Sequence, residues 1–127
     1  MPEHRLFKRV RFVVKTDLEI NGESCEATLV DISLKGALVT FPHELHPKTG
    51  LPCQVTIHLD ESDIKLIFSG EVVHTHDNLT GIKFTLIDLD TMIHLRRLLE
   101  LNTANPAQVR SELNLLLGLE EHNEVMP

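Results

Sequence analysis

The stretch Cys53-Gln54-Val55-Thr56-Ile57-His58-Leu59 shows the clearest hydrophobic pattern in this chain. Apolar side chains stand at every second position, and polar side chains lie between them. Because successive side chains of a β-strand point to opposite faces, this alternation predicts a strand with one buried and one solvated face. A chain of 127 residues with several such strands fits one domain with its own core.

The same period of two recurs in residues 11–20, and turn signals bound the other strand-like runs. We expect strands over residues 11–20, 24–32, 37–41, 53–59, 64–75 and 81–87, joined by turns and one proline-rich loop. Asn21-Gly22 is the strongest hairpin signal because both positions tolerate positive φ. Gly70, inside a long strand, predicts a bulge or a bend. Short strands at regular spacing predict a mainly β fold, a six-stranded antiparallel β-barrel with few exposed edges.

After the last strand the pattern becomes helical. Asp88 or Asp90 can cap a helix from about Thr91 to Leu101, and Asn105-Pro106 is typical of a second helix start, with Gly118 at its end. The apolar stripes of this C-terminal α-helical segment must cover either the barrel's open end or another protomer. We expect a single domain over residues 1–127, comprising a flexible basic arm (1–10), the barrel (11–88), C-terminal helices (89–118) and an acidic tail (119–127).

The charge distribution narrows the class of ligand. The net charge of −7 argues against non-specific binding to a nucleic-acid polymer or an anionic membrane. With five Phe and neither Trp nor Tyr, the chain lacks the aromatic residues of a single-strand-binding surface. The first fifteen residues are nevertheless basic, because they hold Arg5, Lys8, Arg9, Arg11 and Lys15 against a single acidic residue. A basic arm on an acidic protein favours a small anionic ligand.

Other functional classes lack their signals. The chain has no apolar run that could span a membrane and no signal-peptide pattern, so we expect a cytoplasmic protein. Cys25 and Cys53 are isolated, which favours buried free thiols in a reducing compartment. The histidines show no metal-ligand spacing and no catalytic triad order is present, so we predict neither a metal site nor an enzyme.

Two short motifs contain the binding chemistry. Asp31-Ile32-Ser33-Leu34-Lys35-Gly36 places a carboxylate, a hydroxyl and a glycine in a turn between two predicted strands. Arg5-Leu6-Phe7-Lys8-Arg9 places two arginines four residues apart, just before the first strand. Arginine binds phosphate bidentately and also pairs with the O6/N7 edge of guanine, while a carboxylate accepts from base amino or imino groups. Both motifs therefore suit a ligand that has phosphates and base edges.

This pair of motifs resembles the R-x-x-x-R and [D/N]-x-S-x-x-G signatures of PilZ domains, which are bacterial receptors for cyclic di-GMP. Gly70-Glu71-Val72-Val73-His74 and Gly81-Ile82-Lys83-Phe84 resemble a later strand pair of the same family. The resemblance covers residues 4–88, and the helical segment after it is similar to the extension of small stand-alone PilZ proteins.

The resemblance also implies site residues. Cyclic di-GMP, with no cofactor, is expected to bind at Arg5, Arg9, Asp31, Ser33 and Gly36, with Gly36 more structural than contacting. Lys8 and Arg11 flank the arginine motif and are either added phosphate contacts or exposed solubility charges. His74 stands where many relatives carry an aromatic residue that packs on guanine, and the alternative is an ordinary strand-end histidine. His4 stands where the family sets whether one ligand or a stacked pair binds.

The function implied is that of a non-catalytic receptor. On binding cyclic di-GMP its arm would change conformation and signal to a partner protein in motility, biofilm or virulence control, as a monomer or a dimer. One alternative is a PilZ-type protein-interaction adaptor that binds no nucleotide. A small-barrel RNA binder is a further alternative, but Glu19, Glu26 and Glu71 occupy strands where such a protein needs aromatic and basic residues.

Overall fold

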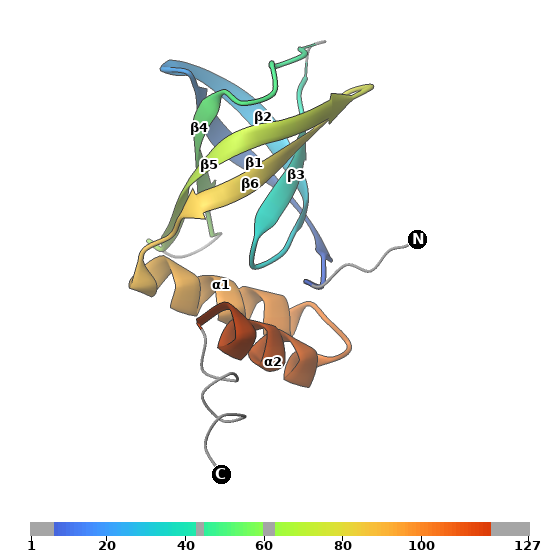
Figure 1. Ribbon diagram of the computed structural model, residues 1–127, viewed down its shortest axis with the longest axis vertical. Coiled ribbons are helices and arrows are strands. Elements are labelled where there is room, and N and C mark those ends of the chain that lie inside the picture. Colours follow the sequence, from blue (N-terminus) through green and yellow to red (C-terminus); the bar gives the residue numbers. More distant parts are fainter. Residues whose placement is uncertain (1–6, 43–44, 60–62, 118–127) are drawn as a thin grey trace.

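Six strands form a closed antiparallel barrel in the order β1-β2-β3-β6-β5-β4, followed by two helices (Figure 1). The structure is a computed structural model that describes residues 7–42, 45–59 and 63–117. The strands are β1 (Val10–Ile20), β2 (Glu23–Ile32), β3 (Gly36–Thr40), β4 (Pro52–His58), β5 (Lys65–His76) and β6 (Leu79–Leu86). The helices are α1 (Leu89–Leu101) and α2 (Pro106–Leu117). The predicted barrel and helical segment are confirmed.

The hairpin turns follow the conformational preferences of their residues. Asn21 and Gly22 adopt φ values of 52° and 90°, which confirms the expected two-residue turn between β1 and β2. The turn between β5 and β6 is shorter than expected and consists of Asp77-Asn78. Asp77 has a φ of 56°, a left-handed conformation that Asp tolerates better than most residues. The predicted bulge at Gly70 is also present, as a register shift against β6.

Inward side chains of all six strands fill the barrel with a single apolar core. Phe68 and Phe84 of this core stack with ring centroids 4.3 Å apart. Leu95 and Leu99 of α1 belong to the same buried cluster, as does Val109 of α2. Each such side chain contributes about 1.5–3 kcal/mol on burial. Of the two surfaces that the helical stripes could cover, the structure shows the barrel end, which α1 closes (Figure 1).

Both helices begin at polar caps. The Asp88 side chain accepts the Thr91 backbone N–H at 2.7 Å, and this bond lowers the pKa of Asp88 below its ordinary value. Helix α1 therefore starts at Leu89, two residues before the expected start, with Asp88 as its cap. Asn105 caps α2 in the same way, because its side chain accepts the Gln108 N–H at 3.2 Å. No helix in the described ranges is long and apolar enough to cross a membrane.

Candidate functional site

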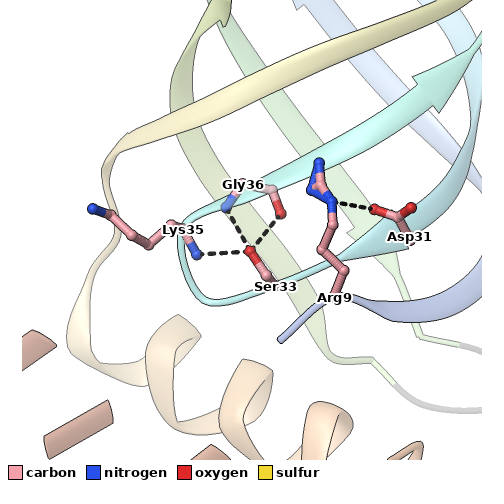
Figure 2. Close-up of polar contacts among 5 residues, drawn as sticks. All are labelled: Arg9, Asp31, Ser33, Lys35 and Gly36. Carbon is pink, nitrogen blue, oxygen red and sulfur yellow. Dashed lines mark hydrogen bonds and ion pairs between the residues drawn. The ribbon is translucent and has the colours of Figure 1, made fainter. Parts of the chain in front are cut away.

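The turn between β2 and β3 is built around one hydroxyl group (Figure 2). Ser33 Oγ accepts the backbone N–H of Lys35 at 3.1 Å and that of Gly36 at 3.2 Å. It also donates to the Gly36 carbonyl at 3.4 Å, while the Ser33 N–H bonds the same carbonyl at 2.8 Å. Ser33 is only 4% exposed. In this state the serine fixes the shape of the turn.

Gly36 lets this turn lie close to the neighbouring strand. It pairs with Lys83 of β6, and a β-carbon at Gly36 would overlap the backbone carbonyl oxygen of Ile82. The adjacent Lys35 carbonyl accepts the Phe84 N–H at 2.8 Å. Clearance against β6 therefore accounts for this glycine, in agreement with a structural role.

Arg9 and Asp31 face each other beside this turn (Figure 2). Arg9 Nε lies 3.4 Å from Asp31 Oδ1, and the two side chains are 26% and 21% exposed. The contact is an ion pair without hydrogen-bond geometry, so the buried Oδ1 has no hydrogen-bond partner among the described residues. A buried carboxylate oxygen that lacks a donor is rare and is an acceptor available to a ligand.

The arm reaches this site through residues with different contacts. Phe7 is buried, and Lys35 Nζ lies 5.2 Å from its ring centroid, within range of a cation–π contact. Lys8 is exposed, but its backbone N–H donates to Glu112 Oε2 at 2.8 Å. The strand starts at Val10, one residue earlier than expected. His4 and Arg5 lie outside the described residues.

A row of paired residues extends the site across the outer face of the barrel. Arg11 of β1 pairs with Asp31, which pairs with Leu38 of β3; Leu38 pairs with Gly81 of β6, and Gly81 with His74 of β5. Paired residues on adjacent strands point to the same face. Arg11 is therefore a direct neighbour of Asp31, whereas His74 is three strand spacings away, roughly 14 Å along the sheet.

The His74 ring lies against Gly81 of the neighbouring strand β6. A β-carbon at Gly81 would overlap the imidazole ring of His74. One ring face is therefore covered by the Gly81 backbone, while the residue as a whole remains exposed. A ring held in this way can offer its other face to a planar group.

Sequence reasoning missed Glu112, which is 6% exposed and bonded to the arm. A signal for it was present, because Glu112 stands three residues after Val109 and one before Leu113, on the predicted apolar stripe of α2. A carboxylate on such a stripe requires a buried partner.

The cysteine thiols and the possible metal-ligating side chains do not form a second site among the described residues. Burial raises the pKa of Cys53 to about 11 and that of Cys25 above its ordinary value, which keeps both thiols protonated at neutral pH. Both cysteines are free. Within the described residues, no group of three or more His, Cys, Asp or Glu side chains could hold a metal ion.

Comparison with known proteins identifies the family of this chain. The model of the PilZ domain matches residues 3–101, so the chain belongs to the PilZ family, whose domains bind ligands or partners. The match covers all residues of the two motifs. The resemblance inferred from those motifs is therefore confirmed.

Solved PilZ structures share the fold at low sequence identity. The PilZ domain of YcgR from Escherichia coli, solved with c-di-GMP, is 10% identical, with a TM-score of 0.66 over 91% of this chain and 98% of that one. The PilZ domain of CeSA from a cellulose-synthesizing bacterium is 18% identical, with a TM-score of 0.56 over 72% and 94%. The Bacillus subtilis inhibitor of motility (MotI/DgrA) is 16% identical, with a TM-score of 0.66 over 89% of this chain but only 53% of its own length.

Proposed function

We propose that this protein is a receptor for cyclic di-GMP. The observation that carries the proposal is the buried Asp31 Oδ1, which has no hydrogen-bond donor among the residues that the structure describes and lies beside the Arg9 guanidinium. Guanine supplies the missing donors through its imino and amino groups, and the ligand's phosphates match arginine. The same fold accommodates c-di-GMP in the YcgR domain from Escherichia coli.

The proposed roles rest on the family's motifs and, for the described residues, on their contacts. Asp31 accepts from a guanine edge, and Arg9, together with Arg5, binds phosphate and the O6/N7 edge. Ser33 can donate to the ligand by giving up its 3.4 Å bond to the Gly36 carbonyl, since its two accepted bonds hold the turn without it. His74 stacks on a guanine through its uncovered face.

Arg11 and Lys8 remain proposed additional phosphate contacts. Arg11 is exposed and paired across the strands with Asp31, which supports its role as a phosphate contact. Lys8 is also exposed and precedes Arg9 directly. His4 is proposed to influence how many ligand molecules bind. Gly36 contributes through the shape of the turn.

The output proposed for this receptor is a changed surface at the arm. Ligand binding neutralises the basic residues of the arm and reorders it, and a partner protein in motility, biofilm or virulence control responds. The protein acts in the cytoplasm without a cofactor. Titration with a candidate partner, with and without cyclic di-GMP, would test this step.

The first test is calorimetric titration of the whole chain with cyclic di-GMP, with GMP and cyclic di-AMP as ligand controls. We expect saturable, guanine-selective binding. Arg9→Ala should weaken it at least about tenfold, the loss expected for a charged hydrogen bond. Lys15→Ala is the control, since Lys15 is an exposed basic residue of β1, the strand that follows Arg9, and it pairs with Thr28 rather than Asp31.

Two results would contradict the receptor function. One is the absence of binding to the wild-type chain by both calorimetry and a method that does not depend on enthalpy, which would favour the adaptor alternative. The other is an Arg9→Ala affinity equal to that of Lys15→Ala with both variants folded by circular dichroism, which would place the ligand elsewhere.

A further inference from the structure

Helix α2 carries a buried carboxylate, Glu112, at a position where packing alone would favour an apolar side chain. Glu112 is 6% exposed and lies on the side of α2 that carries Val109 and Leu113. A carboxylate in such surroundings is strongly unfavourable unless hydrogen bonds replace its water. Leucine would suit this position better for packing alone, so the bonds of Glu112 must explain its presence.

Those bonds connect α2 to the arm. Glu112 Oε2 accepts the side-chain amide of Gln108 at 2.9 Å and the backbone N–H of Lys8 at 2.8 Å. Gln108 precedes Glu112 by one helical turn and orients the carboxylate. Lys8 lies 104 residues away in the sequence, inside the arginine motif and next to Arg9. The helix therefore holds the arm by its backbone, at the residue before the arginine of the site.

The Lys8 bond lies between two other anchors. Phe7 is buried in the core cluster, and Arg9 forms its ion pair with Asp31 at 3.4 Å. Three consecutive residues of the arm are thus fixed by an apolar contact, a backbone hydrogen bond and an ion pair. The backbone bond is the one that restricts the path of the chain between Phe7 and Arg9.

We propose that Glu112 is a positioning residue of the ligand site, an inference that rests on the function proposed above. By holding the Lys8 amide it orders the arm before the ligand arrives, so less conformational entropy is lost on binding. Glu112 Oε1 is buried without a hydrogen-bond partner in the described part of the chain. The carboxylate thus retains capacity for one more donor as the arm closes.

The test removes the acceptor and the donor separately. In calorimetric titration of the whole chain with cyclic di-GMP, Glu112→Leu should weaken binding about tenfold, equivalent to about 1.4 kcal/mol. Its thermal midpoint should change little, because removing a buried carboxylate offsets the loss of the acceptor for the Lys8 N–H and the Gln108 amide. Glu112→Gln keeps an acceptor for the Lys8 N–H and should bind within about threefold of wild type.

Lys8→Pro provides the second route, because it deletes the N–H and leaves α2 unchanged. It should bind about tenfold more weakly than Lys8→Ala, which lacks the same side chain but keeps the N–H. Combining Lys8→Pro with Glu112→Leu should add little further loss, since both remove one interaction. Hydrogen exchange at the Lys8 amide should be fast in Glu112→Leu and slow in wild type and Glu112→Gln.

Glu100→Gln is the control for helix packing. Glu100 of α1 lies 3.7 Å from Arg110 of α2, so this variant weakens contact between the helices without touching the arm, and affinity should not change. Equal or tighter binding by folded Glu112→Leu, or by Lys8→Pro relative to Lys8→Ala, would overturn the inference while leaving the receptor function intact. Absence of binding to wild type would instead remove the receptor function, and the inference with it.

Discussion

The two turns that flank strand β2 both contain glycine, but for different physical reasons. Gly22, between β1 and β2, has a φ of 90°, and a β-carbon there would meet nothing within 4 Å. Gly36, between β2 and β3, needs no positive φ, yet a β-carbon there would overlap the Ile82 carbonyl. Gly22 is therefore required for its positive φ, whereas Gly36 is required for clearance against a neighbouring strand.

The two turns also differ in the groups that hold them. The first turn is tied to the barrel by the backbone bond from Asn21 N to Pro52 O at 2.9 Å. The second is shaped by a buried serine side chain and lies at the barrel end closed by α1 (Figure 1). The dihedral preferences of its own residues specify the first turn, whereas the second also needs clearance against β6, a strand far along the chain.

The largest effect should come from Gly36→Ala. Because the β-carbon would meet backbone rather than a side chain that can rotate away, β3 and β6 must separate, at a cost of about 3 kcal/mol. Urea denaturation should show the lower free energy of unfolding. Cyclic di-GMP binding should also weaken, since Ser33 and Asp31 are positioned by this turn. A denaturation midpoint equal to that of wild type would show that the strands can accommodate the methyl group.

Ser33→Ala should have the next largest effect. It leaves the Lys35 and Gly36 amides without their side-chain acceptor, which should cost about 2 kcal/mol. Ser24→Ala is the control, because Ser24 is an exposed serine at the opposite end of β2, beside the other turn. Thermal unfolding should separate the two variants clearly. Equal midpoints would mean that water replaces the hydroxyl and that the turn does not depend on it.

The barrel and the first turn were predictable because their causes are local. Alternation of apolar and polar residues predicted β1 and β4, the turn signals between apolar runs predicted the other strands, and Asn21-Gly22 predicted its turn from dihedral preference alone. The turn at Asp77-Asn78 contains no glycine, and its short length was not predicted, since Asp indicates a positive φ only weakly. Asp and Asn are common in turns of many kinds, so their presence does not specify this two-residue turn.

The candidate site was predictable only in part. The motifs identified Arg9, Asp31 and Ser33, which the structure brings to one end of the barrel. The bond from Lys8 to Glu112 could not be predicted, because it joins residues 104 positions apart through the packing of two helices. The alignment of His74 with Asp31 likewise depends on register shifts within β5 and β2 that no local pattern specifies.

The smallest effect should come from Gly22, where the comparison can be made sharpest. Gly22→Ala forces a side chain into a positive φ and should cost about 1 kcal/mol. Gly22→Asn should cost less, because asparagine tolerates that conformation and the surrounding space is open. At Gly36 the order of stability should reverse: Gly36→Asn should cost more than Gly36→Ala, since the larger side chain meets the Ile82 carbonyl.

Neither Gly22 variant should alter cyclic di-GMP affinity, because this turn lies at the far end of the barrel (Figure 1). Denaturation curves for the Ala and Asn variants of Gly22 and of Gly36 test this distinction. The same order of stability at both positions would mean that one physical cause, dihedral or clearance, governs both turns.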